Sequence, residues 1–220
     1  MPIPITYIKF PEVDLHQHYG HKLRGYFGNL FKEKSPLLHN HYDDGRLRYA
    51  YPLVQYKVVD NMPMLVGFGE GSELLIELFT RIKRLELGNF VVNIYSKNLK
   101  RIIYEPEILK DNFNRYKFKS LWMGLNQNNF KKYSLLLPGA EQTIFLSNIL
   151  VGNILSFFKG VGYRAEDKIS ALPEVEPRTT MFKNKKMTAF SGEFHTNVSL
   201  PDFAGLGKSV SRGFGTIESY

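Results

Sequence analysis

The sequence contains no cysteine, and this absence excludes several functional classes. A disulfide framework, a cysteine zinc site, an iron–sulfur cluster and a thiol nucleophile all require that residue. The N-terminus, Met1-Pro2-Ile3-Pro4, also lacks the basic region and apolar run of a secretory signal. We therefore expect an intracellular protein, and place it in the cytoplasm.

Long apolar runs are missing too. The longest nearly apolar stretch covers residues 148–158, and Asn148, Gly152, Asn153 and Ser156 interrupt it. A membrane-spanning helix needs about 20 apolar residues. We therefore expect no membrane partner.

Negative charge is scarce relative to positive charge. The chain has 29 Lys and Arg against 21 Asp and Glu, a formal net charge of +8, and 14% of its residues are aromatic. A basic chain rich in Tyr and Phe suits phosphate contact and base stacking, which favours a nucleic-acid partner. The alternative is that excess lysine only keeps the protein soluble.

The spacing of apolar residues in the first half predicts six main elements. Strands are expected over 6–10, 48–59, 64–68 and 90–104, with a turn at 61–63. Helices are expected over 18–34 and 73–87, the second capped by Ser72. The order strand, helix, strand, strand, helix, strand is that of a ferredoxin-like unit. Two helices would cover one face of its sheet and leave the other free to bind RNA.

The second half predicts a similar but modified unit. We expect strands over 114–123 and 187–198, helices over 127–137 and 141–159, an irregular region over 161–186, and a very short final strand. A boundary near Tyr104–Glu107 gives an N-terminal domain over 1–105 and a C-terminal domain over 106–220. The predicted fold class is α+β, with two tandem ferredoxin-like, or RRM-like, domains and a C-terminal glycine-rich loop.

Two Gly-x-Gly elements stand near the C-terminus, at 205–207 and 213–215. Glycines allow the backbone to approach another chain and expose its amide hydrogens, and Lys208, Ser209, Ser211 and Arg212 add phosphate donors between them. A dinucleotide-binding fingerprint does not fit, since only five residues follow Gly215. A tight glycine hairpin without a ligand is the alternative.

This C-terminal pattern resembles the glycine-rich loop of the RAMP superfamily of CRISPR-associated RNA-binding proteins. The whole chain is similar to the repeat endoribonuclease that processes precursor crRNA, in the subgroup with a Leu-Leu-His-x-His segment, here residues 37–41. Residues 24–28 and 51–57 extend the similarity. The resemblance implies a metal-independent endoribonuclease whose partner is CRISPR repeat RNA. The RNA-binding residues would then be Gly205, Gly207, Lys208, Arg212, Gly213 and Gly215, with Lys183, Lys185 and Lys186 as a further clamp.

His39 and His41 are the predicted catalytic pair. In an extended segment their rings point to one side, with Cα atoms roughly 6.5 Å apart. One imidazole would take the proton of the RNA 2′-hydroxyl and the other would protonate the leaving 5′ oxygen, giving 2′,3′-cyclic phosphate and 5′-hydroxyl ends without a metal or other cofactor. Which histidine is the acid stays open.

Two further residues complete the predicted catalytic group. Lys34, with Lys32 beside it, is the nearest cation that could stabilise the phosphorane. Tyr49 resembles the active-site tyrosine of the subgroup, and Arg48 and Tyr42 compete with it.

Other interpretations of these residues remain. Residues 39–43 also resemble the start of a metallo-β-lactamase-like metal motif, but only His195 follows as a further histidine. The rival function is a non-catalytic RAMP subunit that holds crRNA in an effector complex. Effector-complex proteins are thus further expected partners, and the chain would act as a monomer or homodimer. His16, His18 and His21 are expected at a helix start, and His195 on a strand, partly buried or facing RNA.

Overall fold

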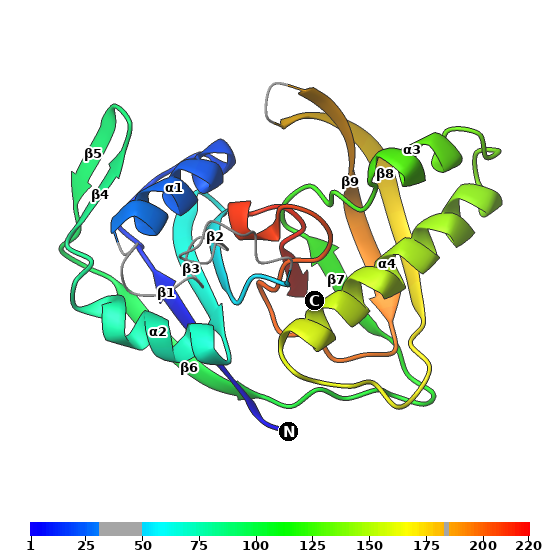
Figure 1. Ribbon diagram of the computed structural model, residues 1–220, viewed down its shortest axis with the longest axis horizontal. Coiled ribbons are helices and arrows are strands. Elements are labelled where there is room, and N and C mark those ends of the chain that lie inside the picture. Colours follow the sequence, from blue (N-terminus) through cyan, green and yellow to red (C-terminus); the bar gives the residue numbers. More distant parts are fainter. Residues whose placement is uncertain (31–49, 183–184) are drawn as a thin grey trace. The chain divides into compact units, whose positions relative to one another are not determined.

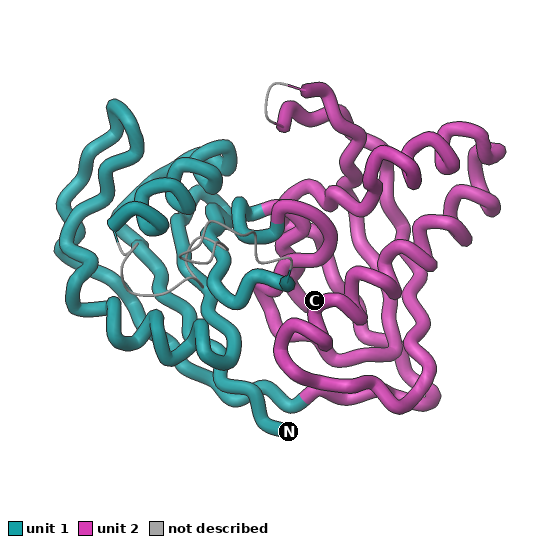
Figure 2. Tube along the Cα trace, in the orientation of Figure 1, with its two compact units in different colours: residues 1–105, 210–213 teal, residues 106–209, 214–220 magenta. Residues whose placement is uncertain are grey.

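The computed structural model describes residues 1–30, 50–182 and 185–220 (Figure 1). The chain forms two compact units (Figure 2). Unit 1 comprises Met1–Glu105 together with Val210–Gly213, and unit 2 comprises Pro106–Ser209 together with Phe214–Tyr220. Four residues of the glycine-rich segment therefore belong to unit 1.

Unit 1 is built on a four-stranded antiparallel sheet in the order β2-β3-β1-β6, with a separate hairpin formed by β4 and β5. This order, with one helix after β1 and one after β3, is the predicted ferredoxin-like arrangement. The elements are β1 (Ile3–Lys9), η1 (Gln17–Tyr19), α1 (Gly20–Leu30), β2 (Val54–Val59), β3 (Met62–Phe68), α2 (Glu70–Phe79), β4 (Arg84–Leu87), β5 (Phe90–Asn93) and β6 (Asn98–Tyr104).

Both helices of unit 1 pack on the same face of this sheet. Phe27 of α1 stacks on Tyr56 of β2 at 5.8 Å between ring centroids. On β1, the Thr6 hydroxyl is hydrogen-bonded to that of Ser72 in α2, at 2.7 Å. Alternate residues of a strand share a face, so these contacts fix which side of each strand meets the helices.

The opposite face of this sheet is also buried over β2 and β3, so the expectation that this face is free to bind RNA is wrong for these two strands. Gln55, Lys57 and Val66 point to that side, and all are fully buried. Tyr51, which precedes β2, covers part of it: its hydroxyl accepts a hydrogen bond from Gln55 Nε2 at 2.6 Å, and its ring meets that of Phe68 edge-on.

The second predicted helix of this half is too long, and its cap is misplaced. Helix α2 begins at Glu70 after Gly69 and ends at Phe79, and Ser72 lies buried inside it. Residues 84–87 form strand β4, in which exposed and buried residues alternate. The predicted turn at 61–63 is likewise shifted: Asp60 and Asn61 have positive φ and form it, while Met62 already belongs to β3.

Unit 2 repeats the same sheet order. Its antiparallel strands run β10-β7-β9-β8, and helix α4 packs against the sheet (Figure 1). The glycine-rich segment between β9 and β10 takes the place of the second helix of a ferredoxin-like unit. The elements of this half are β7 (Asn114–Phe118), α3 (Gln127–Tyr133), α4 (Ala140–Gly160), β8 (Ala171–Phe182), β9 (Lys185–Thr196), η3 (Val210–Arg212) and β10 (Ile217–Ser219).

Aromatic side chains form the core of unit 2. Trp122 is fully buried, stacks on Phe118 at 5.4 Å between centroids, and contacts Phe190. Its indole N–H donates a hydrogen bond to Asn153 Oδ1 of α4 at 2.9 Å. This bond satisfies the polar atom of an otherwise apolar core and ties α4 to the sheet.

The expectation of an irregular region over 161–186 is wrong for its second half. Residues 171–182 form β8, which pairs along its whole length with β9. Pro173 and Pro177 made this segment look unsuited to a strand. Proline cannot donate to a strand ladder and is confined to sheet edges, and β8 is an edge strand of this sheet.

Candidate nucleic-acid interface

The predicted catalytic residues fall in a part of the chain that the structure does not describe. His39, His41, Lys34 and Tyr49 lie outside the described residues, as does Lys183 of the predicted clamp. Their assignment therefore stays a prediction. The described chain leads up to this segment through α1, which ends at Leu30.

The glycines of the C-terminal segment serve close packing within the protein. Gly215 has φ +61°, and a Cβ there would collide with the backbone oxygen of Leu206. Gly207, with φ +93°, faces the indole ring of Trp122 and the backbone oxygen of Met123. Larger residues would be strained at both positions. Gly205 and Gly215 are buried, so their role is to shape the loop.

Several amide hydrogens of this segment are already occupied. Lys208 N–H donates to Met123 O, Gly215 N–H to Leu121 O, and Leu206 N–H to Gly215 O, each at 2.9 Å. Gly213 N–H donates to Val210 O at 3.1 Å. These groups cannot serve as phosphate donors while the fold is intact. The Lys208 side chain, by contrast, is exposed and stays a predicted phosphate contact.

Within unit 1, η3 packs closely against α1 and β2. A Cβ on Gly20 would come within 2.5 Å of the Arg212 backbone oxygen, and one on Gly213 within 3.2 Å of the Tyr56 backbone oxygen. Glycine at both positions permits this approach. The consequence is that Arg212 of the glycine-rich segment lies beside α1.

Arg212 and Arg24 form a pair of like charges. Burial lowers the pKa of the half-buried Arg24 guanidinium, and the nearby positive charge of Arg212 lowers that pKa further. Two guanidinium groups arranged in this way form a favourable site for phosphate oxygens.

Arg24 was not among the predicted site residues. Only its place in the matching segment 24–28 pointed to it. A single arginine on a helix has no signature of its own, because its partner lies at the far end of the chain.

Lys57 of β2 is a second unusual cation in unit 1. It is fully buried, and burial lowers the pKa of its amine from 10.5 to about 7. The backbone of Lys57 lies next to Gly213, since a Cβ added to Gly213 would be 3.6 Å from Lys57 Cα. The amine therefore titrates near neutral pH, and its charge state affects the stability of unit 1.

In unit 2, the β8–β9 hairpin separates positive from negative charge. Residues 177–192 contain Arg178, Lys183, Lys185 and Lys186 but no acidic residue. Arg178, Lys185 and Lys186 are exposed. Near the hairpin end, Phe182 meets Phe214 edge-on at 6.0 Å between centroids. This contact brings the end of the hairpin, which carries Lys185 and Lys186, next to Phe214 of the glycine-rich segment.

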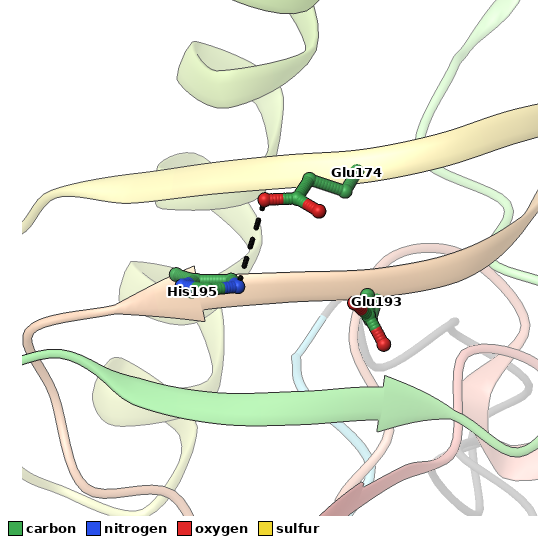
Figure 3. A group of neighbouring side chains, drawn as sticks. All are labelled: Glu174, Glu193 and His195. Atoms are coloured by element: carbon green, nitrogen blue, oxygen red, sulfur yellow. Dashed lines mark ion pairs between the residues drawn. The ribbon is translucent and has the colours of Figure 1, made fainter.

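The other end of this hairpin carries Glu174, Glu193 and His195, on the face away from α4 (Figure 3). One ligand atom of each lies within 4.8 Å of the others, so among the described residues this group could hold a metal ion. The side chains of these residues already interact with other groups of the protein. His195 Nε2 is 3.6 Å from a Glu174 oxygen, and the Tyr220 hydroxyl is hydrogen-bonded to Glu193. Arg115 and Lys117 stand opposite His195 and Glu193 on β7.

The histidines at the start of α1 have a local structural role. His16 is the N-cap of η1, where its ring accepts a hydrogen bond from the His18 amide at 3.3 Å. His21 Nδ1 lies 2.6 Å from His18 O. These contacts agree with their expected position at a helix start.

Comparison with known proteins covers nearly the whole chain. The family model described as Cas6b N-terminal domain matches residues 1–105, and the model described as Cas6b C-terminal domain matches residues 108–220. Protein MJ0978 of Methanocaldococcus jannaschii is 36% identical over 143 residues, which cover 60% of this chain and 97% of that protein.

Two solved structures are similar over their full length. A structure titled as that of Cas6b has a TM-score of 0.93 and 32% sequence identity, with 100% of both chains covered. A structure titled as the CRISPR RNA processing endoribonuclease Cas6b has a TM-score of 0.80 and 30% identity, again with 100% of both chains covered.

Proposed function

The chain belongs to the Cas6b family, and from this premise we propose that it is an endoribonuclease that cuts CRISPR repeat RNA in precursor crRNA. One observation carries the proposal. The chain matches, along its full length, a solved protein titled as a CRISPR RNA processing endoribonuclease.

The proposed reaction is attack of the RNA on itself. The 2′-hydroxyl oxygen forms a bond to the adjacent phosphorus while one imidazole of the His39 and His41 pair takes its proton. The bond from phosphorus to the 5′ oxygen breaks, and the other imidazole gives that oxygen a proton. Lys34 stabilises the charge on the phosphorane, and Tyr49 orients the scissile phosphate. The products are a 2′,3′-cyclic phosphate and a 5′-hydroxyl, with no metal or other cofactor involved.

Separate parts of each unit would hold the RNA. In unit 1, Arg24 and Arg212 take a backbone phosphate. In unit 2, Lys185, Lys186 and Lys208 contact further phosphates. These cations fix the position of the backbone, so affinity will decline with salt.

The partners and location follow from this function. The RNA partner is the CRISPR repeat within precursor crRNA. CRISPR effector-complex proteins are proposed as further partners that receive the product. The enzyme is proposed to act in the cytoplasm, as a monomer or homodimer.

A cleavage assay on labelled repeat RNA in EDTA tests the proposal. We expect cleavage in EDTA, and no cleavage when hydrogen replaces the 2′-hydroxyl at the scissile nucleotide. His39→Ala and His41→Ala should each slow cleavage by about 100-fold or more, with RNA affinity retained. His195→Ala, which alters a histidine of unit 2, is the matched control and should cut normally.

Three results would contradict the mechanism. Binding without cleavage by the unaltered protein would select the non-catalytic crRNA-binding subunit. Cleavage that appears only when metal is restored would select a metal-dependent hydrolase. Cleavage of the deoxy substrate would exclude attack by the 2′-hydroxyl.

A further inference from the structure

Unit 1 contains a pocket between helix α1 and the β4–β5 hairpin, which lie side by side (Figure 1). Its volume is about 570 Å³, within the range of pockets that bind small organic groups. The residues that line it come from α1 and from β4, so it lies within one compact unit. The α1–β4 pocket is lined by Lys22, Tyr26, Asn29, Leu30, Glu86 and Leu87.

The apolar wall of the α1–β4 pocket is held in place. The Tyr26 hydroxyl donates a hydrogen bond to the Arg84 carbonyl oxygen at 2.7 Å, which joins α1 to β4. The Tyr26 ring also meets Phe27 edge-on at 5.1 Å between centroids, and Leu87 is buried. An aromatic ring held in this way, beside aliphatic side chains, suits a flat heteroaromatic group such as a nucleobase.

The polar groups of the pocket complement the edge of a base. The Asn29 amide can both donate and accept, whereas the Glu86 carboxylate accepts only. Both side chains are exposed. Glu86 Oε1 lies 3.0 Å from Arg84 Nε, and this pair leaves Oε2 able to accept from a base amino group. Adenine, cytosine and guanine carry an amino group and uracil does not, so these side chains favour the first three bases.

Lys22 is positioned to contact the phosphate of a nucleotide whose base lies in the pocket. Its Nζ is 4.5 Å from the centre of the Tyr19 ring, a cation–π contact. On the other element, a Cβ added to Gly88 would lie 3.7 Å from the same nitrogen. These neighbours keep the ammonium group at the pocket, where it can bind a backbone phosphate.

The place of the pocket in the chain relates it to the predicted catalytic residues. Leu30 ends α1, and Lys34 follows four residues later. Four residues span at most about 14 Å, so chain length alone keeps Lys34 close to the pocket. Residues two positions apart on a helix point about 200° apart. Lys22 and Tyr26 therefore lie on the opposite side of α1 from Arg24, and the pocket is separate from the arginine pair.

We propose that the α1–β4 pocket binds the base of one unpaired nucleotide of the repeat RNA, close to the scissile phosphate, and selects a base that carries an amino group. This rests on the proposed endoribonuclease function and names a part of its substrate. The nucleotide is unpaired because base pairing would occupy the amino group that Glu86 accepts. Tyr26 stacks on the base, Asn29 and Glu86 contact its edge, and Lys22 holds its phosphate.

Binding of labelled repeat RNA by variants of the full chain tests the proposal. The RNA carries hydrogen in place of the 2′-hydroxyl at the scissile nucleotide, so that binding is measured without cleavage. Glu86→Ala should weaken binding by about tenfold. Glu77→Ala is the matched control, since Glu77 is an exposed carboxylate of α2 outside the pocket. Loss of that negative charge should leave the affinity for a polyanion unchanged or slightly raised.

Base substitution locates the nucleotide and tests its selection. Each unpaired position of the RNA is replaced in turn by uracil, or by another base where uracil is already present. At one position the wild-type protein should bind uracil about tenfold more weakly than a base with an amino group. Glu86→Ala should bind both RNAs equally, whereas Glu86→Gln, which keeps an acceptor oxygen, should retain part of the preference.

A fluorescent base checks that the same position lies in the pocket. With 2-aminopurine at that position, stacking on Tyr26 should quench the fluorescence when the wild-type protein binds. Asn29→Ala, which leaves the pair of Arg84 and Glu86 intact, should reduce both the quenching and the affinity. Circular dichroism of each variant checks its fold.

Two results would overturn the proposal. One is Glu86→Ala binding RNA as tightly as Glu77→Ala does. The other is an RNA in which no position shows a preference that depends on Glu86. The cleavage assay is a separate readout: a protein that shows the preference but does not cut contradicts the endoribonuclease function alone, and one that cuts without the preference contradicts the base pocket alone.

Discussion

Gly20 and Arg212 are in such close contact that a Cβ on Gly20 would lie 2.5 Å from the Arg212 backbone oxygen. Gly20 begins α1, and Arg212 ends η3 of the glycine-rich segment. The packing of that segment within unit 1 therefore depends on the absence of a side chain at the start of one helix.

The first prediction concerns this contact. Gly20→Ala should lower the free energy of unfolding by about 1–3 kcal/mol, because the backbone of Arg212 has to move to relieve the overlap. RNA affinity should fall with it. Gly25→Ala, in the same helix but with open space around it, should be neutral or stabilising by up to about 1 kcal/mol. Urea denaturation compares the two, and equal effects would argue against a special role for the Gly20 contact.

The second prediction concerns Lys57. The pKa of its amine is about 7 in the folded protein, against the ordinary value of 10.5 that applies to the unfolded chain. Between pH 7 and pH 10.5 the unfolded chain therefore binds more protons than the folded one. Stability should thus rise with pH across this window, by up to about 1.4 kcal/mol per pH unit. In Lys57→Met this contribution disappears. The free energy of unfolding of the variant should exceed that of the wild type by the largest amount below pH 7. Denaturation curves from pH 6 to pH 10 measure the difference, and parallel pH profiles would show that the Lys57 pKa is not lowered.

The third prediction concerns the pair of arginines in unit 1. Arg24→Gln and Arg212→Gln should each weaken binding of repeat RNA and reduce the salt dependence of the binding constant by about one unit. If both arginines hold one phosphate, the double variant should lose less affinity than the sum of the two single losses. Arg84→Gln is the control, since Arg84 is exposed and paired with Glu86 at 3.0 Å. Additive losses would place the two arginines on different phosphates.

The fourth prediction concerns the distal part of the β8–β9 hairpin. Replacing Lys185 and Lys186 together by Ala should lower RNA affinity and reduce the salt slope by about two units, without changing the melting temperature. The control replaces Lys131 and Lys132, two exposed lysines of α3, in the same way. If both double variants lose affinity equally, the effect reflects net charge and not a specific surface.

Local sequence patterns were sufficient to predict the bounds of an element where one hydrophobic periodicity dominated the segment. Helix α4 lies within one residue of its predicted bounds, because its apolar residues repeat at three and four positions without interruption. The predicted helix over 73–87 failed because the same spacing runs on to Ile82, beyond the point where α2 ends. Strand β8 was missed because its prolines are acceptable only at a sheet edge, and strand order is not a local property.

The candidate site was predictable only in part. Lys185 and Lys186 could be found as a cluster of cations, and Arg212 as a cation between glycines. Three other features could not be predicted, because each depends on a contact between residues far apart in the sequence. They are the position of Arg24, the burial of Lys57 and the occupied amides of the glycine-rich segment.

The two ferredoxin-like units, the glycine-rich segment and the histidine pair were predictable without coordinates, since spacing and residue type are properties of neighbouring positions. Three features depend on the folded chain: how far each sheet face is buried, which charges lie together and which backbone amides are occupied. Burial, electrostatic interaction and hydrogen bonding act between groups that are close in space, and the fold of the whole chain sets those distances.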